Sequence, residues 1–183
     1  VALSPLTARL FPEVGGGALD SHHGFVVSYT MNGDRDLSFH ADDAEVTLEA
    51  NPATFDAKKA TLFRELGVTR VSLGIQSFVP HVLNTLGREH SPDEAARSVD
   101  LLHEAGISHI NIDLMFSIPG QSKSDWEATL TRAIELKPHH ISAYNLTYEE
   151  DTAFFESLRR GEVRMDEDID ARFFHLAGDF LTS

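Results

Sequence analysis

Short apolar segments that alternate with helical sequence from residue 45 onward constrain the fold of this 183-residue chain most strongly. Four of them end in a polar side chain where a buried strand would stop, namely Glu49, Gln76, Asp113 and Asn145. Strands separated by helices pair in parallel through right-handed crossovers, so their carboxyl ends share one rim of the sheet. Ligands bind at this rim in open and closed α/β folds alike. The pattern therefore predicts a small-molecule site, although it does not name the ligand.

The expected elements follow from the apolar periods and the turn residues. Strands are expected over residues 46–50, 70–76, 109–115 and 140–146. Helices are expected over residues 56–66 and 80–86, from Ser91 to Gly106, from Ser124 to Pro138, through Phe154 to Gly161, and over residues 167–181.

Two of these helices are expected to begin with a capping box, in which a Ser and an acidic residue three positions later satisfy free backbone N–H groups. The first box is Ser91–Glu94 and the second is Ser124–Glu127. The helix after the second box is expected to bury Trp126, Leu130, Ala133 and Ile134 on one face.

Residues 1–44 have a different character from the rest. The glycines of 15–17 and the segment 31–34 interrupt any sustained period, so only one short strand is expected there, over residues 25–29. The chain is therefore divided into a poorly defined N-terminal segment, residues 1–44, and a domain of βα repeats, residues 45–183.

Two α/β architectures fit the repeats. Segments with little polar alternation, such as residues 71–75, suit a parallel sheet buried on both faces. A doubly wound sheet and a partial barrel both satisfy this condition. The polar residues at successive strand ends favour the barrel.

Composition narrows the classes of function. The formal net charge of −14 argues against a nucleic-acid binder, which needs basic residues to neutralise phosphates. No stretch is apolar for the roughly 18 residues that a membrane span needs. The Cys count is zero, which excludes a disulfide framework and the usual all-cysteine ligation of an iron–sulfur cluster by this chain as written. A cytoplasmic protein fits these features most simply.

Two strand-end carboxylates and one nearby arginine carry candidate chemistry. Glu49 and Asp113 could accept hydrogen bonds from a sugar diol or form an acid–base pair, and the alternative is that each caps a loop or pairs with an Arg. Arg88 could bind a carboxylate in bidentate fashion, or it could form a surface ion pair with Glu89 or Glu94. No metal site is expected at His22–His23 or His139–His140, because adjacent residues point to opposite sides of a strand.

Five segments, taken together, resemble one known family. They are Glu45-Val-Thr-Leu-Glu-Ala-Asn-Pro52, Ser72-Leu-Gly-Ile-Gln-Ser-Phe78, Leu86-Gly-Arg-Glu-His90, Asn111-Ile-Asp-Leu-Met115 with Ile118-Pro-Gly-Gln121, and Ile141-Ser-Ala-Tyr-Asn-Leu-Thr147. Their order and spacing resemble radical S-adenosylmethionine proteins of the oxygen-independent coproporphyrinogen III oxidase group. Glu-Ala-Asn-Pro, Gln-Ser-Phe and Leu-Gly-Arg resemble the heme-chaperone branch of that group. The resemblance covers residue 45 to the C-terminus.

The resemblance implies a partial (β/α)₆ TIM-like barrel, truncated at its N-terminus, with S-adenosylmethionine across the strand ends. Glu49, Gln76, Arg88 and Asp113 match cofactor-contacting positions of the family, and Thr147 matches a weaker one. The acids suit ribose hydroxyls and Arg88 suits the methionine carboxylate. Gly16 and Gly17 match the family's glycine triplet, although Ala18-Leu-Asp20 replaces the usual continuation.

One family feature is missing. The Cys-x₃-Cys-x₂-Cys loop holds a 4Fe–4S cluster in the family, and the chain has no Cys. Truncation explains this better than degeneration, because the strand-end residues would have no evident purpose without the cluster. The C-terminal domain expected after residue 183 is absent as well.

Three hypotheses for function follow from the resemblance and from this departure. The first is a segment of a heme chaperone that acts on heme or a porphyrin. The second is an oxidase that decarboxylates coproporphyrinogen III. The third is a cluster-free module that binds a nucleoside or tetrapyrrole without catalysis. The sequence leaves the oligomeric state and the electron donor open.

Overall fold

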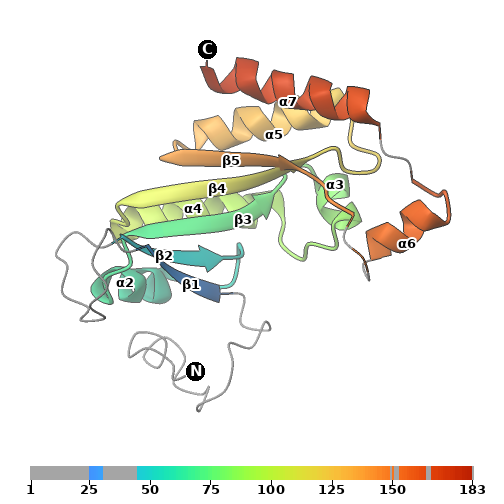
Figure 1. Ribbon diagram of the computed structural model, residues 1–183. Coiled ribbons are helices and arrows are strands. Elements are labelled where there is room, and N and C mark those ends of the chain that lie inside the picture. The colour runs from blue at the N-terminus through green and yellow to red at the C-terminus, as the bar shows by residue number, and fades with distance from the viewer. Residues whose placement is uncertain (1–24, 31–44, 149, 151–152, 164–165, 183) are drawn as a thin grey trace.

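The computed structural model describes residues 25–30, 45–148, 150, 153–163 and 166–182. Figure 1 shows its elements. In chain order they are β1 (Phe25–Thr30), β2 (Glu45–Ala50), α2 (Ala57–Glu65), β3 (Arg70–Gln76), α3 (Pro80–Thr85), α4 (Pro92–Ala105), β4 (His109–Phe116), α5 (Lys123–Glu135), β5 (His140–Asn145), α6 (Ala153–Arg159) and α7 (Glu167–Thr182). The expected strands and helices are all present, with ends that shift by at most three residues.

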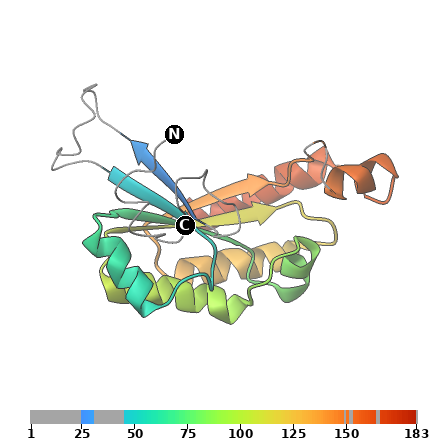
Figure 2. The ribbon, with the colours of Figure 1, turned by 90° about the horizontal axis from the view of Figure 1, so that it is seen from below.

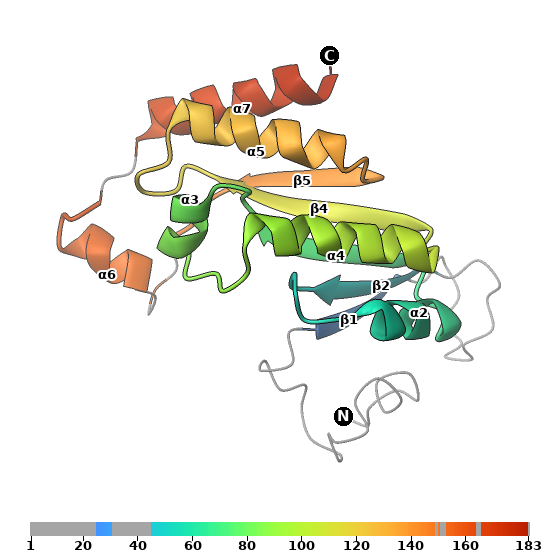
Figure 3. The same cartoon turned by 180° about the vertical axis from the view of Figure 1, so that it is seen from behind.

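The five strands form one sheet in the order β1-β2-β3-β4-β5. β1 pairs antiparallel with β2, and each later pair is parallel. Helices α2, α4 and α5 lie on the same side of this sheet (Figures 2 and 3). A doubly wound sheet would carry helices on both faces, whereas sequential parallel strands with helices on one face are the arrangement of a TIM-like barrel. The structure therefore confirms the α/β class and the preference for a partial barrel.

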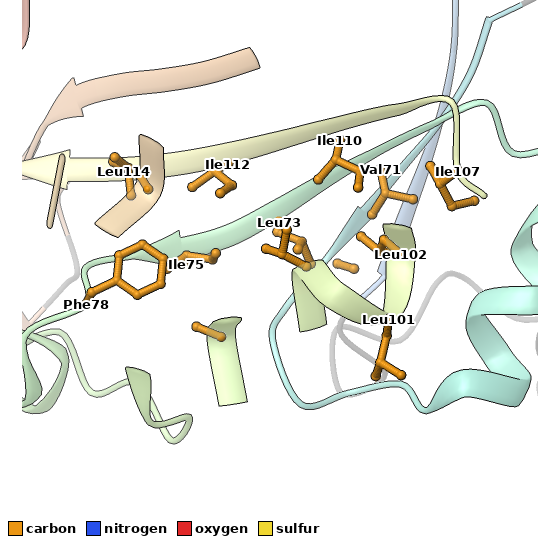
Figure 4. Packing of buried hydrophobic residues seen from close by; sticks show 14 of the residues in the cluster. Val71, Leu73, Ile75, Phe78, Leu101, Leu102, Ile107, Ile110, Ile112 and Leu114 are labelled. Carbon is orange, nitrogen blue, oxygen red and sulfur yellow. The ribbon is translucent and has the colours of Figure 1, made fainter. Parts of the chain in front are cut away.

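The core fills the space between the sheet and the helices (Figure 4). Alternate residues of β3 and β4 point into it and are fully buried, namely Val71, Leu73, Ile75, Ile110, Ile112 and Leu114. Val99 and Leu102 of α4 meet them from the helix layer. Each large aliphatic side chain buried in this way contributes about 1.5–3 kcal/mol. The residues between them in each strand point to the opposite face of the sheet.

Helix α7 is joined to α5 by a buried indole. Trp126 is fully buried, and its Nε1–H donates to the carbonyl oxygen of Phe173 at 3.0 Å. A buried indole N–H needs such an acceptor, so the bond fixes α7 beside α5. Figure 3 shows the two helices side by side.

The capping box at α4 is confirmed, and the one at α5 is wrong by two residues. Ser91 Oγ accepts from the Glu94 N–H, and a Glu94 carboxylate oxygen accepts from the Ser91 N–H at 2.8 Å. In α5 the box is made by Ser122 and Asp125, with the Ser122 N–H 2.7 Å from Asp125 Oδ2. Ser122 is therefore the N-cap, and α5 begins at Lys123, before Ser124.

The expected burial of Ile134 is also wrong. The buried stripe of α5 consists of Trp126, Thr129, Leu130 and Ala133. Ile134 lies one position beyond this stripe, about 100° further round the helix, and is 41% exposed.

Candidate functional site

The strand face that carries no helix layer presents polar side chains. Glu49 of β2, Ser72 of β3 and Asp113 of β4 alternate with the buried residues of their strands. Glu49 pairs with Ser72, and Ser72 pairs with Asn111, in the register of neighbouring strands. The strand period of two therefore gathers these groups on one surface, which we call the open face.

Tyr144 contacts one of the predicted site residues and lies near three others. Its hydroxyl donates to Gln76 Oε1 at 2.9 Å. Burial raises the pKa of Tyr144, and the hydrogen bond to Gln76 opposes this rise. The negative charges of Asp113 and Glu49 raise the pKa further, whereas the positive charge of Arg88 lowers it. The hydroxyl therefore stays protonated at neutral pH and donates to the Gln76 oxygen. The Nε2 group of the Gln76 amide takes no part in this bond.

The Asp113 carboxylate is held by two neighbours. Ser72 Oγ donates to Asp113 Oδ2 at 2.7 Å, and Asn111 Nδ2 donates to Asp113 Oδ1 at 2.7 Å. Hydrogen bonds to a charged acceptor are the stronger kind in proteins. Asp113 is partly exposed, so the lone pairs that these two bonds do not use remain available to accept from a ligand.

Arg88 approaches the same surface from the loop after α3. Its Nη1 donates to Asn51 Oδ1 at 3.2 Å, and Asn51 directly follows β2. Gly74 lies between Asn51 and Gln76, where a Cβ would come within 3.1 Å of Asn51 Oδ1 and of Gln76 Nε2. The absence of a side chain at Gly74 therefore leaves these two polar groups close together at the rim.

Backbone strain concentrates at the same ends of the strands. Ala53, Gln76 and Ser117 follow or end β2, β3 and β4, and they have φ of 63°, 68° and 60°. The Ser77 N–H donates to the Ile75 carbonyl at 2.8 Å, which closes a tight γ-turn at Gln76. Non-glycine residues with positive φ cost about 1–3 kcal/mol each and cluster at functional sites.

Four of the seven predicted site residues act on Tyr144: Gln76 accepts its hydrogen bond, and the charges of Glu49, Arg88 and Asp113 are near enough to influence it. Thr147 is exposed beyond β5 and makes no hydrogen bond with other described residues. Gly16 and Gly17 lie outside the described residues. Glu49 is exposed, and within the described part of the chain its carboxylate has no hydrogen-bond donor.

Sequence reasoning missed Tyr144, Asn111 and Asn51. It chose Asn145 as the polar end of the last strand, but Asn145 is one position out of phase with the open face. The signal for Tyr144 was the alternation of β5, in which Ser142 and Tyr144 share a face. Asn111 is 2% exposed, and an apolar flank on both sides hid it among core residues.

Comparison with known proteins identifies the family. A model of the Radical SAM superfamily matches residues 14–133, which is more than half of the chain. The chain therefore belongs to the radical SAM superfamily, whose members use S-adenosylmethionine and a 4Fe–4S cluster.

Curated relatives resemble the chain over nearly all of its length. The chain is 38% identical over 170 residues to the heme chaperone HemW of Escherichia coli K12, which covers 93% of this chain and 44% of that protein. It is 38% identical over 171 residues to HemW of Mycobacterium tuberculosis, with the same coverage. The chain thus spans less than half the length of these relatives.

Solved structures share the fold. The coproporphyrinogen III oxidase HemN of Escherichia coli matches with a TM-score of 0.66 and 25% identity, over 76% of this chain and 32% of that one. The archaeal Elp3 of Methanocaldococcus infernus matches with a TM-score of 0.59 and 26% identity, over 64% of this chain and 28% of that one. The described sheet and helices are therefore the barrel segment of a radical SAM fold.

The two cofactors of the family fit the chain differently. The acceptors Glu49 and Asp113 and the cation Arg88 suit the hydroxyls and carboxylate of S-adenosylmethionine. The chain contains no Cys, so its own residues do not fit a 4Fe–4S cluster held by thiolates. Among the described residues no group of three His, Asp or Glu could hold a metal ion. None of the described helices has the length and apolar character to cross a membrane.

Proposed function

We propose that this chain is the S-adenosylmethionine-binding barrel segment of a cytoplasmic heme chaperone. The observation that carries the proposal is the convergence of Glu49, Gln76, Arg88 and Asp113 around Tyr144 at the carboxyl ends of the strands. The region 1–44 is proposed as a separate segment and 45–183 as the barrel domain.

The four side chains complement S-adenosylmethionine in the polarity of their hydrogen bonds. The carboxylates of Glu49 and Asp113 accept from the ribose hydroxyls, and the Arg88 guanidinium holds the methionine carboxylate. Gln76 Nε2 supplies a donor, because Tyr144 already occupies Oε1. Gly16, Gly17 and Thr147 are further proposed contacts.

The cofactor proposal is tested by calorimetry on the complete product of the gene that encodes this sequence. S-adenosylmethionine is expected to bind, and Asp113→Ala is expected to weaken binding by about tenfold or more, because a charged hydrogen bond contributes about 1.5–3 kcal/mol. Unchanged affinity would remove Asp113 from the site. The 183-residue chain alone is expected to bind weakly, because it lacks thiolates for the iron that chelates the methionine group.

The choice of heme as the partner is supported by the relatives named heme chaperone at 38% identity. The second candidate, oxidative decarboxylation of coproporphyrinogen III, is favoured by the structural match to HemN. Anaerobic incubation of the complete gene product with each compound separates them. The proposal expects that heme absorbance elutes with the protein in size-exclusion chromatography. It also expects that coproporphyrinogen III releases no carbon dioxide. Release of carbon dioxide would replace the chaperone with the oxidase.

The third candidate, a binding module without a cluster, is favoured by the absence of Cys. The coding sequence upstream of Val1 decides this point. A Cys-x₃-Cys-x₂-Cys motif there supports radical S-adenosylmethionine chemistry, in which the cluster supplies the electron that cleaves the cofactor. A complete gene without the motif would leave only the binding module.

A further inference from the structure

Asn111 lies on the open face of β4, two residues before Asp113, and is not among the residues proposed to contact the cofactor. It is 2% exposed, although an amide side chain is usually found at the surface. Its hydrogen bonds reach β3, β4 and β5, and one of them ends on Asp113.

The neighbours of Asn111 fix the orientation of its amide. An ionised carboxylate only accepts hydrogen bonds, so the atom 2.7 Å from Asp113 Oδ1 must be the Nδ2 donor. The same nitrogen donates to Ser72 Oγ at 2.6 Å, and Ser72 Oγ in turn donates to Asp113 Oδ2. The two N–H groups of the amide are therefore both engaged on the side of β3 and Asp113.

The carbonyl end of the amide faces β5. Ser142 Oγ donates to Asn111 Oδ1 at 3.2 Å, and His140 Nδ1 lies 2.5 Å from the same oxygen. His140 must carry its proton on Nδ1, because two acceptors at this distance would repel each other. Each hydrogen-bonding position of Asn111 is thus filled, and the network has one direction, from His140 and Ser142 to Asp113.

We propose that Asn111 is a positioning residue that holds the Asp113 carboxylate as an outward-facing acceptor for the ligand. The inner side of each carboxylate oxygen is occupied, Oδ1 by Asn111 and Oδ2 by Ser72. The carboxylate can then meet a donating hydroxyl without first reorienting, and such preorganisation increases affinity. The inference rests on the proposed function, in which Asp113 binds the cofactor.

A double-mutant cycle on the complete gene product tests this role. Asn111→Ala is expected to weaken S-adenosylmethionine binding by about tenfold in calorimetry. In a protein that already carries Asp113→Ala, the same change is expected to have no further effect on affinity, because Asn111 acts through Asp113. A further loss in that background, or full affinity of Asn111→Ala alone, would overturn the positioning role.

A second variant separates positioning from simple structural support. Asn111→Asp has nearly the same shape and can still accept from Ser142 and His140, but it has no N–H groups to donate to Ser72 or Asp113. S-adenosylmethionine affinity is expected to fall by about tenfold in calorimetry, and to fall no further when Asp113→Ala is already present. Thermal unfolding of the same proteins shows whether the fold is retained.

The outcomes distinguish this inference from the proposed function. Near-normal affinity of Asn111→Asp would overturn the inference, and this variant decides the question if Asn111→Ala does not fold. A loss of affinity in Asp113→Ala without one in Asn111→Ala would refute only the positioning role. If neither substitution alters binding, the cofactor site itself is wrong.

Discussion

The two faces of the parallel sheet differ in composition, burial and bonding. On the face covered by helices, β3 and β4 present Val, Leu and Ile side chains that are fully buried. On the open face, the same strands present Ser72, Asn111 and Asp113, which are joined by hydrogen bonds of 2.6–2.7 Å. One face is closed by apolar packing, and the other carries polar groups that bond to one another.

The difference shows how one strand serves two purposes. Because successive side chains point to opposite faces, neighbouring residues can belong to the core and to the site without competing for space. Stability should therefore depend mainly on the helix-covered face, and binding mainly on the open face. Four predictions examine this division, in order of decreasing effect.

The first compares two adjacent residues of β4. Ile112→Ala is expected to lower the free energy of unfolding by about 2–5 kcal/mol, because Ile112 is fully buried and leaves a cavity. Asp113→Ala is expected to lower it by about 1 kcal/mol, because Asp113 is partly exposed and shortening it lets water reach the N–H of Asn111 and the O–H of Ser72. Urea denaturation measures both. A larger loss of unfolding free energy for Asp113→Ala than for Ile112→Ala would contradict the idea that stability depends mainly on the helix-covered face.

The second concerns Gly74 on the open face. Gly74→Ala places a methyl group 3.1 Å from Asn51 Oδ1 and Gln76 Nε2, so both side-chain ends must shift. S-adenosylmethionine affinity is expected to fall by about tenfold, or 1.4 kcal/mol, in calorimetry. Gly178→Ala in α7 is the control, because its Cβ would meet nothing within 4 Å. Equal affinities of the two variants would contradict the proposed crowding.

The third prediction concerns the N-cap of α5 in the helix layer. Ser122→Ala removes the N-cap of α5 and is expected to cost about 1 kcal/mol of unfolding free energy. Ser124→Ala, two residues further into the helix, is expected to change it by less than about 0.5 kcal/mol. Chemical denaturation of the two variants provides the comparison. A greater cost at Ser124 would restore the capping box expected from the sequence.

The fourth and smallest concerns pH. Burial lowers the pKa of His90, whose ring bonds the Ile75 carbonyl, and the charge of Arg88 lowers it further, while the bonded carbonyl and Glu94 oppose both. Just below pH 6.5 the unfolded chain therefore binds more protons at His90 than the folded chain does. The stability that neutral His90 contributes is complete above that pH, and it is lost as the pH falls through the lowered pKa.

Thermal unfolding between pH 7 and pH 5 measures the effect. His90→Gln keeps a donor for the Ile75 carbonyl but does not titrate, so its melting temperature should depend less on pH than that of the unmodified protein. Identical slopes would show that His90 makes no such contribution.

The order of strands and helices was predictable because it depends on local signals. Apolar period, turn glycines and the Ser91 cap each act within a few residues, and the structure confirms what they indicate. The errors at Ser124 and Ile134 arose where two local choices were nearly equal. Two Ser residues could begin α5, and its apolar stripe could end at either of two neighbouring positions.

The site was only partly predictable, because its supporting bonds join residues far apart in the chain. Glu49, Gln76, Arg88 and Asp113 came from motifs that the sequence displays directly. The bonds from Tyr144 to Gln76 and from Asn111 to Ser72 span 68 and 39 positions. No local pattern specifies such a bond.

The sequence by itself therefore determined the βα repeat, the helix-covered core and the polar character of the strand ends, since period and composition are properties of neighbouring residues. Only the tertiary structure decided which polar groups meet. Strand register places Asn111 beside Ser72, and parallel pairing brings Tyr144 to Gln76. These contacts depend on how strands from distant parts of the chain align, and that alignment is set by packing of the whole sheet against its helices.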